Sequence, residues 1–505
     1  MGNTTIEINL GFVRDNYLFF RKLTGHGKNC FPVVKANAYG LGILEVVEAL
    51  LQIEEPQRDF FVYSLRSALD IRLNFGSRVS NIYVLRGPLA GQEEIFAEYS
   101  IIPAINSLEQ LKIWSNYARS SGKRLTTVLQ FNLGINRSGI EIDLARYFQD
   151  FISFKENGID LAMIMGHLGC QHPLDSPLGQ RYTIRELDNF RKVTAFFPGI
   201  KRNLVESRGA IYLPKARYEG SRIGIGLFTF EKEKNTEIKT VLSIKCDLQR
   251  DRRSGKLFIN FGTENGLSED YENGGFVYVG DKKVYVKRVQ DRKTLLDPGN
   301  ESLTSSTALL VGHMGKNHID GYEFSRMNGT IPEELFALIL TKNRNKEDVM
   351  IDFIGNRFAS TGLEKPSDPR LLENLAEFDQ NGRLVKLTST ISEKRTVRED
   401  GFCGYDATEP VKMGDSLVTI SLGYLDGFSR KLSGTKVKMF IKNASRRIFP
   451  CILCGRVSMD QICARIDRKA FEEVEIGDKV LIIDDSIALG DKKLRAALNT
   501  SLLMV

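Results

Sequence analysis

Near the N-terminus, one stretch of sequence places a lysine directly after a run of apolar residues. It reads Phe31-Pro32-Val33-Val34-Lys35-Ala36-Asn37-Ala38-Tyr39-Gly40-Leu41-Gly42. The run at 31–34 predicts a short buried strand. A lysine at the end of such a strand can be buried, which disfavours its ammonium form and leaves an amine that can form a Schiff base. On its own the lysine is more simply explained as a side chain that reaches solvent, but Tyr39 and two glycines could bring a hydroxyl and close backbone to an anionic group.

The alternation of strand and helix continues from this stretch to about residue 228. Short apolar runs bounded by Gly, Pro or Asn predict eight buried parallel strands, at 31–34, 60–64, 81–85, 101–105, 126–131, 161–165, 204–206 and 223–227. The stretches between them are amphipathic, and Ser107 to Gln110 forms a capping box that opens one helix. This pattern predicts an α/β fold, a (β/α)8 TIM barrel over residues 1–233, with its chemistry in the residues that follow each strand.

The pattern changes after about residue 233. Apolar runs at 241–248, 416–422, 437–441, 448–453 and 480–483 have no long helices between them. They predict a mostly β C-terminal domain, assigned to residues 234–248 and 392–505. Residues 249–391 separate its two parts and are predicted to be an inserted region of unknown role, long enough to fold as its own unit. Within it, 276–279 and 284–286 predict a hairpin, and 332–340 predicts a helix.

Composition excludes several classes of protein. Of 505 residues, 42% are hydrophobic and 26% are charged, which is typical of a globular protein. The formal net charge of +7 is too small for this length to indicate a nucleic-acid or membrane partner. The first residues carry no signal-peptide pattern, and the seven scattered cysteines fit reduced thiols, so we expect a cytoplasmic protein. The pair Cys451 and Cys454 has no second pair at zinc spacing, and no metal site is expected.

Three separated motifs together resemble the alanine racemase family, whose enzymes use pyridoxal 5'-phosphate (PLP). They are the stretch around Lys35, Gly423-Tyr424-Leu425-Asp426-Gly427-Phe428, and Gly455-Arg456-Val457-Ser458-Met459-Asp460-Gln461. Thr5 to Leu10 is similar to the opening of the family, and the resemblance covers roughly residues 5–245 and 390–490. It implies an isomerase that interconverts L- and D-alanine, supplies D-alanine for peptidoglycan, and forms a homodimer with active sites shared across the interface.

The resemblance implies a mechanism with two bases. Lys35 would hold the cofactor and act on one face of the substrate, and Tyr424, supplied by the other subunit, would act on the opposite face. Inversion at Cα needs a proton carrier on each face, which two residues from different domains can provide. Outside its motif, Tyr424 would be an ordinary half-buried strand tyrosine.

The resemblance also implies the contacts of cofactor and substrate. Arg222 would donate to the pyridine nitrogen, and because a guanidinium stays charged the ring would remain a mild electron sink. The other residues implied to bind the cofactor are Tyr39, His167, Ser207, Gly224 and Ile225. Those implied to bind the substrate are Arg137, Met459 and Asp460.

The chain departs from the family in four places. Gln130 stands where many members have a carbamylated lysine, and Glu206 stands where an asparagine is usual. No tyrosine follows Tyr424, so a phosphate contact made by a late tyrosine is expected to be absent, and the usual two-domain enzyme has no counterpart to the inserted region. These departures leave two alternatives open: a racemase of another amino acid such as serine or lysine, or a PLP-binding protein of low activity whose insertion regulates it or binds a partner.

Overall fold

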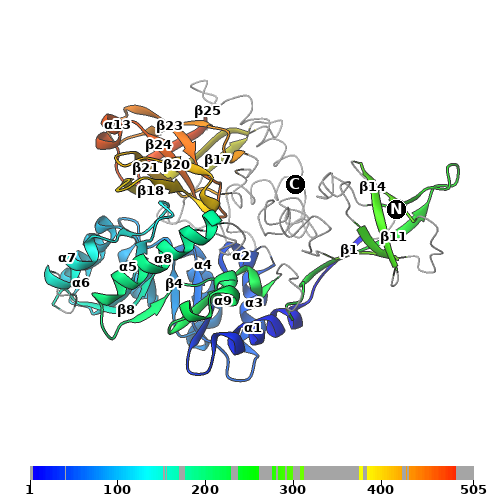
Figure 1. Ribbon diagram of the computed structural model, residues 1–505, viewed down its shortest axis with the longest axis horizontal. Coiled ribbons are helices and arrows are strands. Elements are labelled where there is room, and N and C mark those ends of the chain that lie inside the picture. Colours follow the sequence, from blue (N-terminus) through cyan, green and yellow to red (C-terminus); the bar gives the residue numbers. More distant parts are fainter. Residues whose placement is uncertain are drawn as a thin grey trace.

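The N-terminal half of the protein is a TIM barrel of eight parallel strands (Figure 1). The computed structural model describes residues 4–39, 41–151, 154, 156–169, 177–228, 237–260, 276–279, 282–290, 293–298, 307–311, 375–378, 384–423, 428 and 432–484. The barrel strands are β2 (Asn29–Pro32), β3 (Phe60–Val62), β4 (Ile82–Val84), β5 (Ile101–Ile105), β6 (Leu125–Asn132), β8 (Ile159–Met165), β9 (Lys201–Asn203) and β10 (Gly220–Ile223). They pair in the order β2-β10-β9-β8-β6-β5-β4-β3, and a parallel bridge between Val33 and Phe61 completes the circle. The predicted fold class is confirmed.

Amphipathic helices connect these strands and bury one face against them. They are α1 (Leu10–Thr24), α3 (Ile43–Leu51), α4 (Leu65–Phe75), α5 (Glu93–Glu98), α6 (Leu108–Ser121), α7 (Leu144–Phe151), α8 (Pro177–Ala195) and α9 (Ser207–Tyr212). Helix α6 begins as predicted: Ser107 Oγ accepts from the Gln110 amide at 3.2 Å, and Gln110 Oε1 accepts from the Asn106 amide at 2.8 Å. None of the helices in the described ranges is long and apolar enough to cross a membrane.

Two of the eight predicted strands are displaced along the sequence. The extended segments end at Asn203 and Ile223, whereas 204–206 and 225–227 form the turns that follow them. Leu204, Val205 and Leu227 are fully buried in the core, so these apolar residues pack the turns rather than extend the strands. Apolar runs predict burial more directly than they predict strand ends.

The rest of the chain forms two antiparallel β barrels. The first, named here the first β domain, contains β1 (Thr4–Ile8), β11 (Leu242–Arg250), β12 (Leu257–Ile259), β13 (Phe276–Val279), β14 (Lys282–Val289), β15 (Thr294–Asp297) and β16 (Thr307–Val311). The second β domain contains β17 (Leu375–Phe378), β18 (Leu384–Thr396), β21 (Ser416–Ile420), β22 (Lys438–Lys442), β23 (Ile448–Cys454), β24 (Ile462–Ile466) and β25 (Lys479–Asp484). Figure 1 shows the second β domain over one end of the TIM barrel and the first β domain to one side.

These pairings divide the chain differently from the predicted domain boundaries. Strand β11 was grouped with residues 392–505, but it pairs with β1, β12 and β16 in the first β domain. Strands β12 to β16 come from the region predicted as an insertion, and they include the predicted hairpin, with Val279 opposite Lys282. The predicted helix at 332–340 lies outside the described residues.

A buried amide fastens helix α1 to the chain that leaves the TIM barrel. Asn16 is fully buried; its Nδ2 donates to the carbonyls of Leu227 at 3.0 Å and Lys239 at 2.7 Å, and its Oδ1 accepts from the Lys239 amide at 2.7 Å. The neighbouring Asp15 instead forms an exposed ion pair with Lys239 at 2.6 Å.

We expect Asn16→Ala to lower the free energy of unfolding by about 3 kcal/mol, because it leaves buried backbone groups without partners. Asp15→Ala should change it by less than about 1 kcal/mol, because the exposed ion pair is screened by water. Urea unfolding monitored by circular dichroism would compare the two variants. An equal loss of free energy of unfolding in both variants would show that the buried Asn16 amide does not hold α1 to this segment.

Candidate active site

The turn that carries Lys35 has an unusual backbone. Ala36, Asn37, Ala38 and Tyr39 all have φ between 51 and 58°, the left-handed region that residues other than glycine seldom adopt. Such residues cost about 1–2 kcal/mol each. Part of this cost is offset because Asn37 Oδ1 accepts from the amide of Ile43 at 2.8 Å, at the start of α3. Strain held in place by surrounding structure is a feature of functional sites.

Lys35 is bound by a carboxylate from the second β domain. Its Nζ lies 2.6 Å from Asp460 Oδ2, and the two side chains are 20% and 3% exposed. Asp460 and the buried Met459 belong to the turn 455–461 between β23 and β24. Gly423 packs against this turn so closely that a Cβ on it would lie 2.1 Å from the Met459 carbonyl oxygen. The motif that contains Gly423 therefore meets the Asp460 turn, although Tyr424 itself lies outside the described residues.

Hydroxyls and backbone amides gather at the end of β10. Ser207 Oγ accepts from the amides of Gly224 at 3.2 Å and Gly226 at 3.1 Å. Tyr39 lies against the same turn, since a Cβ on Gly224 would be 2.1 Å from the Tyr39 hydroxyl oxygen. The predicted phosphate-binding residues Tyr39, Ser207, Gly224 and Ile225 are thus together, and glycine is required at 224 for this close approach.

Arg222 is buried beneath the barrel mouth in a cradle of oxygen atoms. Nη1 donates to the carbonyl and the side-chain oxygen of Asn203, and Nη2 donates to the carbonyls of Gly166 and Leu204. Burial lowers the pKa of Arg222 to about 10, so the guanidinium stays charged at neutral pH. These bonds use Nη1 and Nη2, which leaves Nε as the donor for a ligand.

A tyrosine from the second β domain contacts two predicted site residues of the TIM barrel. His167, just after β8, has its Nε2 2.8 Å from the hydroxyl of Tyr405, and the Arg137 guanidinium lies 4.6 Å from the centre of the Tyr405 ring. Burial, together with the positive charges of Arg137, Arg222 and Lys35, holds the pKa of His167 well below its usual value. The imidazole is therefore neutral and can either accept a proton from the phenol or donate one to the phenolate.

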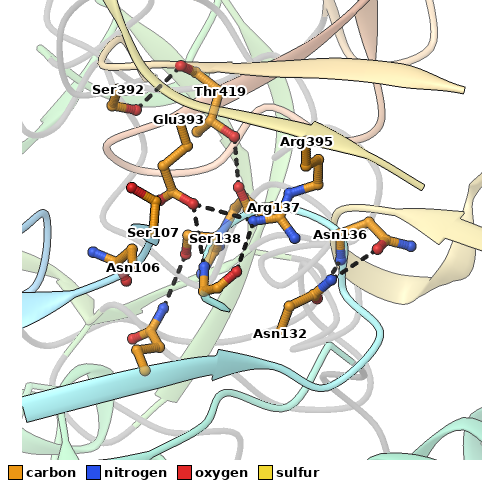
Figure 2. Close-up of polar contacts among 12 residues, drawn as sticks. Asn106, Ser107, Asn132, Asn136, Arg137, Ser138, Ser392, Glu393, Arg395 and Thr419 are labelled. Carbon is orange, nitrogen blue, oxygen red and sulfur yellow. Dashed lines mark hydrogen bonds and ion pairs between the residues drawn. The ribbon is translucent and has the colours of Figure 1, made fainter. Parts of the chain in front are cut away.

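The loop that carries Arg137 is held from both sides (Figure 2). On the barrel side, Gln130 Nε2 donates to Ser138 Oγ at 3.0 Å. On the other side, Glu393 of β18 accepts from the Gly139 amide at 3.2 Å, and Thr419 of β21 donates to the Arg137 carbonyl. Arg137 Nε is buried and has no hydrogen-bond partner in the described structure, which suits a residue that awaits an anionic ligand.

The structure assigns local roles to the two unusual residues of the sequence. Gln130 stabilises the loop through Ser138. Glu206 caps α9 by accepting from the amides of Arg208 at 2.9 Å and Gly209 at 2.8 Å, and its charge opposes the lowering of the Arg222 pKa by burial.

Comparison with known proteins identifies the family of this chain. The family model described as alanine racemase, N-terminal domain, matches residues 8–232, and the model described as alanine racemase, C-terminal domain, matches residues 384–501. The chain belongs to the alanine racemase family. Alanine racemases of Rickettsia africae and Rickettsia rickettsii are each 27% identical to it, over 366 and 371 residues, which is 68% of this chain and 99% of theirs.

Solved structures of alanine racemases share the fold. The enzyme of Bartonella henselae, whose structure contains covalently bound pyridoxal phosphate, has a TM-score of 0.57 and 22% identity, covering 68% of this chain and 98% of that one. The enzyme of Acinetobacter baumannii has a TM-score of 0.54 and 20% identity, covering 66% of this chain and 97% of that one.

Tyr405 was not predicted from the sequence. It lies in an irregular segment, Gly404-Tyr405-Asp406-Ala407, in which Gly404, Asp406 and Ala407 have φ of 77, 60 and 51°. The amide of Gly404 donates to the Ile135 carbonyl at 2.9 Å, and the amide of Asp406 donates to the Gly169 carbonyl at 3.0 Å. A glycine followed by a tyrosine in a loop is too common a pattern to identify a site, so only these long-range contacts reveal it.

Glu186 of α8 supports the barrel loop on which this segment docks. It is 1% exposed, its Oε1 accepts from the Gly169 amide at 2.9 Å, and burial raises its pKa to about 8. A carboxyl with a raised pKa contributes its stability fully below its ordinary pKa of 4.5 and loses it as the pH rises through about 8.

We therefore expect Glu186→Gln to remove this pH dependence while it keeps the oxygen that accepts from Gly169. The free energy of unfolding of the wild type should fall from pH 5 to pH 9, whereas that of the variant should not fall for this reason. The difference between variant and wild type should therefore increase, as measured by urea unfolding at both pH values. Asp188→Asn, on the exposed face of the same helix, should show no such gain, since its carboxylate is paired with Lys192 in solvent. A wild-type stability that does not fall over this range would contradict the raised pKa.

Proposed function

We propose that this protein is a PLP-dependent racemase that interconverts L- and D-alanine. Lys35 holds the cofactor and carries a proton on one face of the substrate, and a tyrosine of the β domain carries a proton on the other. The observation that carries the proposal is a pair of contacts across the domain boundary. Tyr405 contacts His167 and Asp460 contacts Lys35, so two turns of the second β domain reach two functional residues of the TIM barrel.

The described residues fit the cofactor. Hydroxyls of Tyr39 and Ser207 lie against the turn at Gly224 and Ile225 and suit a phosphate as hydrogen-bond donors. Arg222 suits the pyridine nitrogen as a charged donor, and Lys35 suits the carbonyl carbon as an amine. When bound, the cofactor withdraws electrons from Cα of the amino acid and makes its hydrogen acidic.

The residues of this chain then have separate tasks. Lys35 Nζ and the Tyr424 hydroxyl are the proton carriers, and the neutral His167 positions the Tyr405 hydroxyl through their hydrogen bond. Arg137 binds the substrate carboxylate through its unpartnered Nε, while its ring contact helps to position Tyr405. Asp460 positions the Lys35 amine, and Met459 lines the same turn.

We propose Tyr424 as the proton carrier on the second face, as the motif that contains it implies, and Tyr405 as a positioning residue, because its hydroxyl contacts His167 and its ring contacts Arg137. A cytoplasmic role in D-alanine supply for peptidoglycan, and the homodimer, stay predictions that rest on the family.

Lys35→Ala is expected to abolish both the covalent attachment of the cofactor and the activity. The purified wild type should show a visible absorption band that borohydride removes, and a coupled assay should detect D-alanine from L-alanine. L-Serine and L-lysine are the comparison substrates. A wild type that racemises either of them with a higher kcat/KM than alanine would overturn the assignment of the substrate.

Tyr424→Phe should keep the absorption band but lower kcat in both directions by about 100-fold or more, because it removes one of two proton carriers. In D2O the variant should still exchange the Cα hydrogen of one enantiomer through Lys35 without inverting it. Tyr405→Phe is the matched control. If Tyr405→Phe shows this signature and Tyr424→Phe does not, the assignment is reversed.

A further inference from the structure

The two β domains have the same topology. The strand order is β1-β11-β12-β15-β14-β13-β16 in the first and β17-β18-β21-β24-β23-β22-β25 in the second, and each closes through an additional pairing, β11 with β16 and β18 with β25. All seven pairings in each domain are antiparallel. Taken in chain order, the named strands correspond one to one. Such agreement in both sequence order and spatial order indicates two copies of one domain.

The copies differ in the connections that carry the site. Between β18 and β21 the second domain has residues 397–415, which include Tyr405, whereas the first joins β11 to β12 through 251–256. Between β23 and β24 the second has 455–461, which include Asp460, whereas the first joins β14 to β15 through 290–293.

The short turn in the first copy is closed by its own hydrogen bonds. Asp251 Oδ1 accepts from the amides of Arg253 at 3.0 Å and Ser254 at 2.7 Å, and the Gly255 amide donates to the Asp251 carbonyl at 2.9 Å. Gly255 has φ +70°, as such a tight turn requires. This turn has neither a tyrosine nor the length to reach a neighbouring domain.

The copies also differ in how they join the TIM barrel. In the first, the whole barrel separates the lead strand β1 from β11, whereas in the second only residues 379–383 separate β17 from β18. The C-terminal family model begins at residue 384, so it matches the second copy, whereas strands β11 to β16 of the first copy lie between the two matched regions. The second copy is therefore the one that corresponds in sequence to the C-terminal domain of the family.

The second copy is docked on the TIM barrel of its own chain through buried charges (Figure 2). Arg395 of β18 bonds to Glu141 at 2.9 Å, to the Gly139 carbonyl at 3.1 Å and to Glu393 at 3.1 Å, and its side chain is 5% exposed. Asn136 Nδ2 donates to the Phe402 carbonyl at 3.0 Å. An arrangement of the domains that separated these groups would leave a buried charge without its partner. The cluster therefore favours this one docked arrangement.

We propose that this chain completes its own active site: the first β domain is a duplicate without site-bearing turns, and the second supplies Tyr405 and Asp460 to the barrel of the same polypeptide. One chain is then the whole catalytic unit, in contrast to the shared homodimer sites expected from the resemblance. Residues 312–374 join β16 to β17 in the same chain. The second β domain is therefore present at its own TIM barrel at an effective concentration far above that of the same domain on a separate chain. The domain contacts behind this proposal do not depend on which reaction the protein catalyses. Only the activity test below rests on the proposed function.

The first test cross-links the docked surface. Arg185 of α8 and Glu399 form an ion pair between the TIM barrel and the second β domain, with side chains 33% and 61% exposed. The full-length double variant Arg185→Cys/Glu399→Cys, treated with a short bismaleimide, should yield a cross-linked species with the mass of one chain at every protein concentration. The six cysteines in the described part of the chain are buried free thiols, and untreated and wild-type samples control for background reaction of any native cysteine.

The matched control is Glu48→Cys/Arg78→Cys, an ion pair at 2.8 Å within the TIM barrel that must cross-link inside one chain. If the Arg185/Glu399 pair gives cross-linked dimers while the control does not, the site is shared between chains and the proposal is wrong. If the control reacts and the test pair gives no cross-link, the docking itself is wrong. This test needs no enzymatic activity.

The second test mixes two inactive variants. Lys35→Ala and Tyr424→Phe, unfolded and refolded together, should recover none of the wild-type activity when each site is built from one chain. If sites are shared between two chains, about a quarter of the sites in randomly formed dimers would contain neither defect, and activity would return. Wild type refolded in parallel is the control, and a wild type without racemase activity would refute the proposed function while leaving the cross-linking result intact.

Discussion

The candidate site depends on a buried charge cluster that fixes the second β domain to the mouth of the TIM barrel. Arg395 contacts Glu141 and a loop carbonyl of the barrel, while Glu393 binds Arg395 and the amide of Gly139. Burial raises the pKa of Glu393 to about 8, and the neighbouring Arg395 opposes this rise. The cluster lies directly behind Arg137. The same contacts that join the domains therefore position the residue expected to bind the substrate.

Backbone strain occurs on both sides of this junction. On the barrel side, four consecutive residues after Lys35 adopt the left-handed conformation, and on the other side Asp406 and Ala407 do so just after Tyr405. Neither turn contains a glycine at these positions, so the conformations are maintained by surrounding contacts. Asn37 supports the first turn, and the ion pair of Asp406 with Arg456 at 2.5 Å links the second to the Asp460 turn. Docking thus stabilises two local conformations that would be costly in isolated segments.

The sequence predicted the TIM barrel and most of the residues grouped at its mouth, because both follow from local patterns. Apolar runs located the barrel strands to within a few residues, and the motifs around Lys35, Ser207 and Arg222 identified one side of the site. Tyr405 and the pair Glu393 and Arg395 were not predicted, because their roles arise from contacts between residues far apart in the chain. The duplication was missed for a related reason. The two domains agree in strand pairing, which a hydrophobic pattern does not encode, and their connecting turns differ in length.

The comparison of the two β domains separates what the barrel fold requires from what the site requires. Six strands close into a barrel in both, with buried aliphatic residues such as Val277 and Val286 in the first and Ile441 and Leu453 in the second. In the first domain, the turn between β11 and β12 is short and satisfies its own polar groups. In the second, the corresponding connection is longer, contains strained backbone at Asp406 and Ala407, and has amides that donate to carbonyls of the TIM barrel. The first domain shows that this β barrel closes without the long connection. We therefore infer that the second domain keeps its long connection for the site that the connection completes.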